Sequence, residues 1–366
     1  MSAEREQMNK YEVCIIGGGA AGLAAAASLD SHINTCLLEK NEILGRKLMA
    51  TGGGRCNITN RACGNKALTM DFFKSMGLEM YCDEEGRFFP YSNQASDVVK
   101  VLTLAMAEKR VAVVTNAAVK DIAYEKGAFA ISYAEDNIVC CDNVILAMGG
   151  KASPQFGTTG DGYAIAKSLG HRIERVYPIL TAIECGSFKD IKGVRAKGRV
   201  SLYRNDRLLA EETGEIQFTE DGISGICVFN LTPHIKAEAG ESFGEALKQF
   251  TIRADMAPDF TKEQIAERRS SFGILSEKLA SRVDIDEIKC WQLPVLGVKG
   301  WKNAQCTAGG VALDEIDMST MESKIIPGLY FAGEIIDRQG PCGGYNLQNA
   351  WETGIKAAKS LNGKLK

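Results

Sequence analysis

Residues 11–40 read YEVCIIGGGAAGLAAAASLDSHINTCLLEK, and the order of signals in this stretch decides the fold. An apolar run at residues 13–16 is followed by GGGAAG at residues 17–22, which fits the pattern G-x-G-x-x-G. A helix-compatible run follows at residues 23–29, and a second apolar run ends at Glu39. Strand, glycine turn, helix, strand and acid in this order predict a dinucleotide-binding βαβ unit.

Each glycine of the pattern has a physical role. Gly17 permits the tight turn, Gly19 allows the backbone to approach a pyrophosphate, and Gly22 lets the helix close onto the strand. The start of the helix directs unpaired N–H groups toward the phosphates. Glu39 can accept hydrogen bonds from both hydroxyls of an adenosine ribose. This motif alone leaves both FAD and NAD open as ligands.

Composition indicates an ordinary soluble globular protein. The 366 residues suggest two domains, and 45% apolar with 24% charged residues allow a sizeable core. The net charge of -3 gives no overall attraction to nucleic acid or to an anionic membrane. Twelve cysteines with no C-x-x-C motif and no secretory segment predict reduced thiols in a cytoplasm. The three histidines lack metal-ligand spacing, so no metal site is expected.

Residues 41–60, NEILGRKLMATGGGRCNITN, are the most unusual part of the sequence. Three consecutive glycines at residues 52–54 allow the backbone to lie flat against a ligand. The cations Arg46, Lys47 and Arg55 supply positive charge for a pyrophosphate or for an anionic reduced flavin. The alternative interpretation is a flexible, solvated loop.

The segments that follow predict further helices and strands. Apolar spacing favours helices within residues 67–110, and short β-type runs within residues 111–140 suggest a small antiparallel sheet beside the main one. A buried parallel strand at residues 144–147 ends in a glycine exit, and a helix opens near Gly162. In a dinucleotide fold such strand exits and helix starts lie near the cofactor.

The pattern of predicted strands and helices changes twice more along the sequence. We predict an inserted domain at residues 181–304 that is β-rich to about residue 235 and helical after about residue 240. Residues 1–180 and 305–366 would then form one domain. In its last part a short strand ends at residues 333–334, and the glycine-rich residues 340–344 lead into a final helix. This again indicates a ligand at the carboxyl ends of strands.

Four blocks of this sequence resemble a known bacterial flavoprotein family. They read IIGGGAAGLAAA, GRKLMATGGGRCNITN, GTTGDGYAIAKSLGH and TMESKIIPGLYFAGEIIDRQGPCGGYNLQNAWETG. The family is the BaiN/RdsA-type NAD(P)/FAD-dependent oxidoreductases, also labelled aminoacetone-oxidase-family FAD-binding enzymes. The resemblance implies an α/β fold in which both chain ends form a Rossmann-like FAD-binding domain, with an inserted β-barrel-like part and a small helical domain. It also implies tight, noncovalent FAD.

The resemblance and the strand exits together give a set of expected cofactor contacts. They are Gly17, Gly19, Ala20, Ala21, Gly22, Glu39, Lys40, Arg46, Lys47, Gly53, Gly54, Arg55, Cys56, Asn57, Ala147, Gly149, Gly162, Gly333, Glu334, Gly344, Tyr345, Asn346, Leu347 and Gln348. The start of the final helix would face the pyrimidine edge of the flavin, where its dipole stabilises negative charge on reduction. One segment departs from the family: larger relatives are similar to F-T-H-x-G-x-S-G-P where residues 218–226 read FTEDGISGI. The substrate is therefore not carried over.

The leading hypothesis is an FAD-dependent oxidoreductase that transfers hydride at flavin N5. It would reduce a conjugated C=C bond or oxidise a small amine or ketone, with NADH, NADPH or oxygen as partner. No second G-x-G-x-x-G follows a strand, so a nicotinamide would dock only transiently. The candidates for proton transfer are Asp337, Cys342 and Tyr345, in the loop before the final helix. Each also has a structural alternative, such as an ion pair between Asp337 and Arg338.

Two other functions stay open. The resemblance implies that some relatives reduce a uridine of ribosomal RNA to dihydrouridine, and the cation-rich stretch from Lys189 to Arg207 could bind RNA phosphates. Lysines and arginines that point outward on exposed strands would give the same pattern. The second alternative is a non-catalytic FAD-binding redox sensor. No membrane partner is expected, and the sequence leaves the oligomeric state unknown.

Overall fold

The computed structural model of the chain describes residues 10–135 and 137–366. The chain divides into two compact units, the first made of Met1–Val176 and Cys306–Lys366 and the second of Tyr177–Gln305. Each unit has a hydrophobic core of its own. None of the helices within the described ranges is long and apolar enough to cross a membrane.

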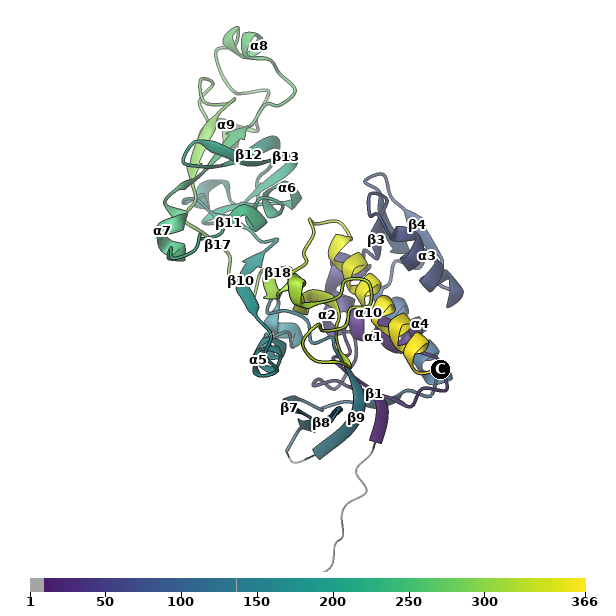
Figure 1. Ribbon diagram of the computed structural model, residues 1–366. Helices are drawn as coiled ribbons and strands as arrows, with labels where there is room; N and C mark the ends of the chain where they lie inside the picture. Colours follow the sequence, from purple (N-terminus) through teal and green to yellow (C-terminus); the bar gives the residue numbers. More distant parts are fainter. Residues whose placement is uncertain (1–9, 136) are drawn as a thin grey trace, which may run out of the picture. The chain divides into compact units, whose positions relative to one another are not determined.

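The main sheet of the first unit confirms the predicted Rossmann-like α/β fold (Figure 1). Its parallel strands follow the order β6-β2-β1-β9, and β19 pairs in parallel with β9. These strands are β1 (Lys10–Ile16), β2 (Thr35–Leu38), β6 (Ala112–Val114), β9 (Asn137–Leu146) and β19 (Leu329–Phe331). Both ends of the chain therefore contribute strands to one sheet.

The expectation of a separate antiparallel sheet within residues 111–140 is wrong. Strand β6 is a parallel edge strand of the main sheet, and β7 (Val119–Glu125) and β8 (Ala128–Tyr133) extend that sheet as an antiparallel meander. The reason is the length of β9, which pairs with β8 along its first half and with β19 along its second. One unbroken strand thus joins the two ladders.

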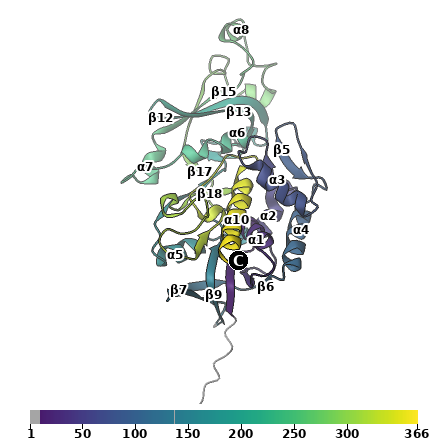
Figure 2. The ribbon, with the colours of Figure 1, turned by 45° about the vertical axis from the view of Figure 1, so that its right-hand side comes forward.

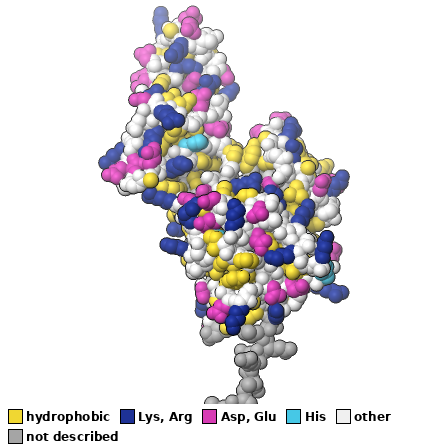
Figure 3. Space-filling model, in the orientation of Figure 1, with side chains coloured by type: hydrophobic (Ala, Val, Ile, Leu, Met, Phe, Trp, Pro, Cys, Tyr) yellow, Lys and Arg dark blue, Asp and Glu magenta, His cyan; other side chains and the backbone are white. Residues whose placement is uncertain are grey.

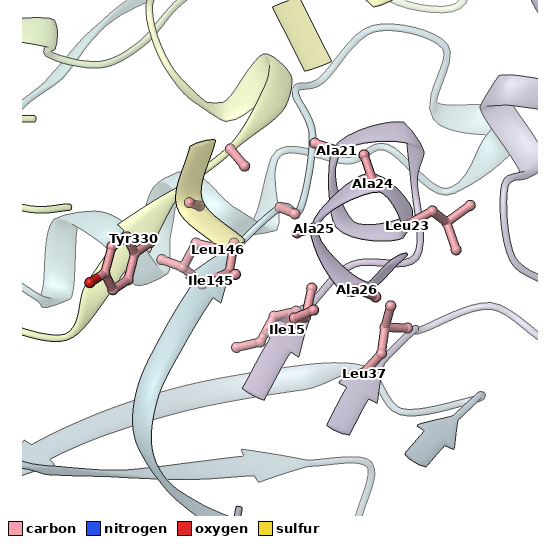
Figure 4. Close-up of a cluster of buried hydrophobic side chains, with 14 of the residues drawn as sticks. Ile15, Ala21, Leu23, Ala24, Ala25, Ala26, Leu37, Ile145, Leu146 and Tyr330 are labelled. Atoms are coloured by element: carbon pink, nitrogen blue, oxygen red, sulfur yellow. The ribbon is translucent and has the colours of Figure 1, made fainter. Parts of the chain in front are cut away.

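Helix α1 (Ala20–Ser28) covers the middle of the parallel strands. Figure 4 shows Ala24, Ala25 and Ala26 of α1 above the strands that carry Ile15 and Leu37. Ala21 through Ala27 are all buried. Because all of these residues except Leu23 have small side chains, the helix axis can approach the sheet closely, and the start of the helix stays at the carboxyl ends of the strands.

Helix α10 (Tyr345–Lys364) packs along α1, and the two lie side by side in both ribbon views (Figures 1 and 2). An added Cβ on Gly354 would lie 2.3 Å from the carbonyl oxygen of Ala21, so the close approach requires glycine at this position. The packing brings the starts of an N-terminal and a C-terminal helix into one unit.

Shorter elements complete the first unit, and one of them, β10, continues past residue 176 into the second unit. A three-stranded antiparallel sheet has the order β3-β5-β4, and β10 pairs with β18. The bounds are α2 (Arg46–Ala50), η1 (Thr51–Gly54), β3 (Thr59–Asn60), α3 (Lys66–Ser75), β4 (Met80–Cys82), β5 (Arg87–Pro90), α4 (Ala95–Glu108), η2 (Pro154–Phe156), α5 (Asp161–Ser168), β10 (Ile173–Ile179), β18 (Cys306–Val311), η5 (Leu313–Glu315) and η6 (Gly333–Ile335).

The second unit is built on a seven-stranded antiparallel sheet with the order β16-β15-β12-β13-β14-β11-β17. Its strands are β11 (Ile183–Glu184), β12 (Arg195–Arg204), β13 (Arg207–Phe218), β14 (Gly222–Ser224), β15 (Phe250–Asp255), β16 (Trp291–Pro294) and β17 (Gly297–Val298). Its helical elements are η3 (Lys189–Ile191), α6 (Ile226–Phe229), η4 (Thr232–His234), α7 (Phe243–Leu247), α8 (Lys262–Ala266) and α9 (Glu277–Ala280).

The expectation that this region is helical after about residue 240 is wrong in part, because β15, β16 and β17 lie there. Burial alternates residue by residue along β15, which is the period of a strand. The ladder with β12 fixes this strand, and the helices between β15 and β16 are only four or five residues long.

Candidate active site

The carboxyl ends of the parallel strands meet at one edge of the main sheet. The N–H of Gly17 donates to the carbonyl oxygen of Leu38 over 2.8 Å, and the N–H of Ala147 donates to that of Ile16 over 2.9 Å. On the other side of β9, the N–H of Ala332 donates to the carbonyl oxygen of Leu146 over 3.0 Å. The turns after β1, β2, β9 and β19 are thereby held next to one another.

In the glycine turn after β1, two of the three motif glycines have no room for a side chain, and the third borders open space. An added Cβ would lie 2.4 Å from the carbonyl oxygen of Ala147 at Gly17, and 1.9 Å from that of Gly17 at Gly22. At Gly19 an added Cβ would meet no atom within 4 Å. The first and third glycines are thus required by the fold, whereas the second borders open space at the start of α1.

The start of α1 leaves backbone donors available. Gly19 is the N-cap, no side chain caps the helix, and no acidic residue occupies the first turn, which includes Ala20 and Ala21. The first N–H groups of a helix have no intrahelical partner, and the positive end of the dipole attracts anions. This helix start therefore suits a pyrophosphate.

Glu39 is oriented by backbone and side-chain amides. Its side chain is almost fully buried, and Oε2 accepts the N–H of Gly18 at 2.7 Å. Oε1 accepts both the backbone N–H of Asn41 at 2.8 Å and the side-chain amide of Asn41 at 2.5 Å. A carboxylate has about four acceptor positions, so with three donors bound about one position remains for a ribose hydroxyl. The open space at Gly19, the uncapped helix and this oriented acid fit the adenosine diphosphate part of FAD.

The three consecutive glycines form an ordered turn. Gly52, Gly53 and Gly54 have φ of 60°, 67° and 87°, a left-handed conformation that favours glycine. Added Cβ atoms on Gly53 and Gly54 would meet nothing within 4 Å, so open space borders the turn. The guanidinium of Arg55 lies 4.6 Å from the centre of the Phe89 ring, and its Nε donates to the carbonyl oxygen of Gly52 over 3.3 Å. Arg55 thus holds the turn on the small sheet.

Cys56 and Asn57 follow this turn. Cys56 is buried, and burial raises the pKa of its thiol to about 12, so the thiol stays protonated near neutral pH. With its amide oriented to satisfy both partners, Asn57 donates to the carbonyl oxygen of Thr59 at 3.1 Å and accepts the N–H of Gly344 at 3.0 Å. The glycine turn is therefore tied to the start of α10.

Two predicted contacts, Lys40 and Arg46, have partners within the protein. Lys40 Nζ lies 2.5 Å from Asp161 Oδ2 and donates to Thr159 Oγ1 over 2.6 Å. Burial opposes the charge of Asp161, but the hydrogen bonds from Lys40 and Thr159 lower the pKa of Asp161. Arg46 donates to Asn41 Oδ1 over 2.8 Å. Both cations therefore help to order the loops around the glycine turn.

Gly149 and Gly162 belong to the segment between β9 and α5. Gly149 has φ of 72°, and an added Cβ on Gly162 would lie 2.8 Å from Cδ1 of Ile335. Tyr163, which the sequence did not single out, donates its hydroxyl to the carbonyl oxygen of Glu334 over 3.5 Å. Burial, and then the charge of Glu334, raise the pKa of Tyr163 well above its ordinary value. The start of α5 thus lies against the exit of β19.

Lys47 and Glu334 form an ion pair at this exit. Lys47 Nζ lies 2.8 Å from Glu334 Oε2, and Glu334 Oε1 accepts the N–H of Thr307 at 2.9 Å. Burial opposes the charge of Lys47, but the neighbouring Glu334 raises the pKa of Lys47 overall. Gly333, just before Glu334, has φ of 80° and donates its N–H to Thr353 Oγ1 over 2.9 Å.

The start of α10 interlocks with the strand after the glycine turn. Gln348 Oε1 accepts the hydroxyl of Thr59 at 2.6 Å, and Asn346 Oδ1 accepts the N–H of Gly340 at 2.9 Å. No side chain caps α10 at Gly344, and its first turn, which includes Leu347, contains no acid. The arrangement leaves a second helix start suited to negative charge.

The three candidates for proton transfer differ in their surroundings. Asp337 Oδ1 accepts the N–H of Gly309 at 3.1 Å, and Arg338 pairs with Glu352 at 3.4 Å, so the alternative pair between Asp337 and Arg338 is wrong. Cys342 is half-buried and lies near Cys306, whose thiol pKa is raised by burial, by Glu334 and by Cys342. The third candidate, Tyr345, is the first residue of α10.

The hydroxyl of Tyr345 forms no hydrogen bond with any residue in the ranges 10–135 and 137–366. Burial, and then the nearby thiol of Cys63, raise the pKa of Tyr345. The phenol is therefore protonated at neutral pH and free to bond a ligand. Of the three candidates, it has the proton-donating form and the available hydroxyl together.

The cations between Lys189 and Arg207 face acids of neighbouring segments. Lys192 pairs with Glu220 at 3.2 Å, and Lys197 pairs with Asp259 at 2.6 Å. Figure 3 shows cationic and acidic side chains interspersed over the visible face of the second unit. Within the described part of the chain, no group of three or more His, Cys, Asp or Glu residues could hold a metal ion.

Comparisons with known proteins agree with this architecture. The family model described as HI0933-like protein Rossmann domain matches residues 65–360. The chain is 34% identical to the 3-dehydro-bile acid delta(4,6)-reductase of Clostridium scindens over 94% of this chain and 98% of that protein. It is 24% identical to the ribosomal RNA dihydrouridine synthase of Escherichia coli over 97% of this chain and 98% of that protein.

Solved structures show the same overall fold. The 3-ketosteroid-delta4-(5alpha)-dehydrogenase of Rhodococcus jostii, in complex with 4-androstene-3,17-dione, aligns with a TM-score of 0.53 at 12% identity over 98% of each chain. The quinol fumarate reductase of Escherichia coli aligns with a TM-score of 0.52 at 14% identity, covering 98% of this chain and 71% of that chain. At these identities the likeness concerns the fold alone.

Proposed function

The chain belongs to the HI0933-like family of FAD-dependent oxidoreductases, and from this membership we propose that it reduces a carbon–carbon double bond conjugated to a ring ketone. The observation that carries the proposal is the 34% identity to a bile acid delta(4,6)-reductase over almost the full length of both proteins. The product would be the saturated or less unsaturated ketone.

The residues at the carboxyl edge of the sheet would hold FAD. The start of α1 and Gly19 would bind the pyrophosphate, and Glu39 would bind the adenosine ribose. The turn at residues 52–54 and the start of α10 would border the rest of the cofactor. When bound, FAD supplies the hydride chemistry that such a reduction requires.

Tyr345 would donate the proton. Reduction of a conjugated ketone adds one hydride to the β-carbon and one proton, first bonded at the carbonyl oxygen or at the α-carbon. The Tyr345 hydroxyl suits this donation because its raised pKa keeps it protonated at neutral pH and it has no hydrogen-bond partner among the described residues. Asp337 and Cys342 remain weaker candidates, since the Asp337 carboxylate is engaged by a backbone amide.

NADH or NADPH would supply the electrons from solution. The sequence has one G-x-G-x-x-G turn between strand and helix, so the proposal places no second dinucleotide domain in the chain. A nicotinamide would then bind only while it reduces the flavin. The preference between the two nucleotides is measured directly by comparing their rates of flavin reduction.

The same hydride and proton would also reduce a uridine ring. The relatives named ribosomal RNA dihydrouridine synthases, at 24% and 26% identity, keep this substrate as the second candidate. The ion pairs of Lys192 and Lys197 weigh against phosphate binding by this stretch, because their charges are already balanced.

The test is reoxidation of the reduced protein by defined substrates. The purified protein is expected to contain a chromophore that absorbs near the FAD maximum, and to be bleached by NADH or NADPH without air. A 3-keto bile acid with a delta-4 double bond should then restore the oxidised spectrum, whereas its saturated analogue should not. Restoration by uracil-containing RNA alone would favour the second candidate, and a protein that takes up no FAD contradicts both.

A further inference from the structure

We propose that Glu334 masks the positive charge of Lys47 beside the bound FAD, and that this masking sets the reduction potential of the flavin. The inference rests on the proposed function, because it requires FAD at the carboxyl edge of the sheet. It concerns the one ion pair that joins α2 to the exit of β19 among the described residues.

The pair lies between the two glycine turns. The N–H of Gly45, just before α2, donates to the carbonyl oxygen of Gly18 over 2.8 Å, and α2 leads directly into the turn at residues 52–54. On the other side, an added Cβ on Gly333 would lie 2.8 Å from Cβ of Ala21 at the start of α1. Lys47 and Glu334 therefore belong to the segments that border the proposed cofactor.

The geometry fixes both charges. Lys47 Nζ lies 2.8 Å from Glu334 Oε2, and each side chain is 23% exposed. Glu334 Oε1 accepts the N–H of Thr307 at 2.9 Å, and Thr307 Oγ1 in turn accepts the N–H groups of Lys151 at 2.8 Å and Ala152 at 3.1 Å. The carboxylate is thus held in place by β18 and by the loop after β9, and it faces the ammonium with its second oxygen.

The other titratable groups close to the pair come from β18, α5 and the segment before α10. Cys306 and Tyr163 interact with the pair directly, whereas Cys342 lies near Cys306 and Asp337 lies near Tyr163. Burial and the charge of Glu334 raise the pKa of both Cys306 and Tyr163, so these two groups are neutral near pH 7. When the charge of Lys47 or Glu334 is removed, Cys306 and Tyr163 therefore do not change their own protonation to compensate for it.

An exposed positive charge near a flavin favours its reduced form, because reduction adds negative charge. A paired ammonium presents little net charge. Glu334→Gln keeps the size of the side chain and removes its charge, which leaves Lys47 unmasked. Lys47→Met leaves the carboxylate without a cation, and the double variant has neither charge.

The experiment measures the two-electron midpoint potential of bound FAD at pH 7 with reference dyes, together with the FAD dissociation constant. We expect Glu334→Gln to raise the equilibrium constant for reduction about tenfold, a positive shift of about 30 mV, and Lys47→Met to lower it by a similar factor. The double variant should return close to the potential of the unaltered protein. Lys47→Arg, which keeps the charge, should change it little.

A pH series shows whether the change in flavin potential is caused by the charge of Lys47 or by an altered structure. Without Glu334, burial lowers the pKa of Lys47, so the positive shift of Glu334→Gln should fade as the pH rises and the ammonium loses its proton. The matched control is Lys364→Met, which removes a cation from the more exposed pair with Glu322 and should leave the potential unchanged.

Single variants that bind FAD with an unchanged potential would overturn the inference, and so would a double variant displaced as far as either single one. Failure of the unaltered protein to bind FAD contradicts the proposed function instead. The two failures are therefore distinct, because the first is observed on a protein that has retained its flavin.

Discussion

Gly19 and Gly22 differ in what surrounds their missing side chains, although both belong to the same motif. A Cβ on Gly22 would collide with the carbonyl oxygen of Gly17, whereas one on Gly19 would enter open space. Gly19 also has φ of -84°, which any residue adopts. Gly22 is thus needed by the fold, whereas Gly19 is needed only if the proposed pyrophosphate lies beside it.

The first prediction follows from this difference. Gly19→Ala should leave the melting temperature of the FAD-free protein unchanged and weaken FAD binding about tenfold or more, because the new methyl group enters the space of the pyrophosphate. Gly22→Ala should lower the stability of the FAD-free protein by about 1–3 kcal/mol through overpacking. Thermal unfolding with and without FAD measures both. Equal loss of stability in the two variants would contradict the separation.

Tyr345 carries the second prediction. Tyr345→Phe should lower turnover with an enone about 10²- to 10⁴-fold while FAD binding and reduction by NAD(P)H are retained, because only the proton donor is lost. The pKa of Tyr345 is raised, so the phenol stays protonated through neutral pH, and the rate should fall only above about pH 10. Tyr124→Phe, in the meander, is the control and should keep full turnover. A variant at Tyr345 with normal turnover would exclude this role.

At the scale of elements, the close packing of helices α1 and α10 requires the glycine at position 354. Within α10, Gly354 lies against Ala21 of α1, whereas Gly363 in the last turn meets nothing within 4 Å. Alanine favours a helix over glycine by about 1 kcal/mol when nothing opposes it. The two positions therefore separate helix propensity from helix packing.

The third prediction compares alanine at these two positions. Gly354→Ala should destabilise the first unit by about 1–3 kcal/mol, because the new Cβ would lie 2.3 Å from a backbone oxygen. Gly363→Ala should be neutral or slightly stabilising. Urea unfolding followed by circular dichroism measures the difference. A stabilising effect at Gly354 would show that α10 can move away from α1 without cost.

A buried histidine links the segment before β10 to the segments around β19. His171 Nε2 accepts the hydroxyl of Ser323 at 3.0 Å, and His171 Nδ1 donates to Glu315 Oε2 at 3.2 Å. Burial lowers the pKa of His171, and the charge of Glu315 offsets this only in part. The imidazole is therefore neutral in the folded protein near pH 7, and Ser323 keeps an acceptor.

The fourth prediction concerns the stability of the protein at acidic pH. Because the folded-state pKa of His171 is depressed, its contribution to stability is fully present above about pH 6.5 and is lost as the pH falls toward the folded-state value. His171→Asn should remove this part of the pH dependence. The free energy of unfolding is measured at pH 7.5 and 5.5 for both proteins. An equal loss in both would show that other groups are responsible.

At the scale of the whole molecule, the cation-rich stretch of the second unit is largely paired with acidic side chains. The net charge is -3, and Lys192, Arg195 and Lys197 of the second unit each have an acidic partner within 4 Å. Exposed pairs of this kind contribute about 0–1 kcal/mol each to stability. Their main effect is to leave little positive potential for a polyanion.

The fifth prediction is therefore weak, salt-sensitive binding of RNA. Uracil-containing single-stranded RNA should be retained at about 50 mM salt at most weakly, and lost at about 150 mM, because most cations between Lys189 and Arg207 are already paired with acids. Filter binding at the two salt concentrations is the measurement. Removing the acids that pair with Lys192 and Lys197, Glu220 and Asp259, should strengthen retention. Tight binding of RNA at about 150 mM salt would contradict this prediction and favour RNA as a substrate.

The sequence predicted the first βαβ unit because its signals are local. Residues 11–40 contain strand, turn, helix and acid in one run, and the α/β fold follows from that order. Strand β15 was missed because its six residues gain their order from pairing with β12, about 50 residues earlier. Lys47 and Glu334 are 287 positions apart, and no sequence pattern in either segment predicts that they form an ion pair.

The position of β19 has a consequence for the order of events at the ribosome. This strand and α10 come from the last part of the chain, yet β19 completes the sheet edge beside β9 and α10 supplies one of the two helix starts. The second unit has its own core and can form earlier in synthesis. The site that borders Gly333 and Gly344 can close only after β19 and α10 have been synthesised, so the residues that precede them cannot form the complete cofactor site alone.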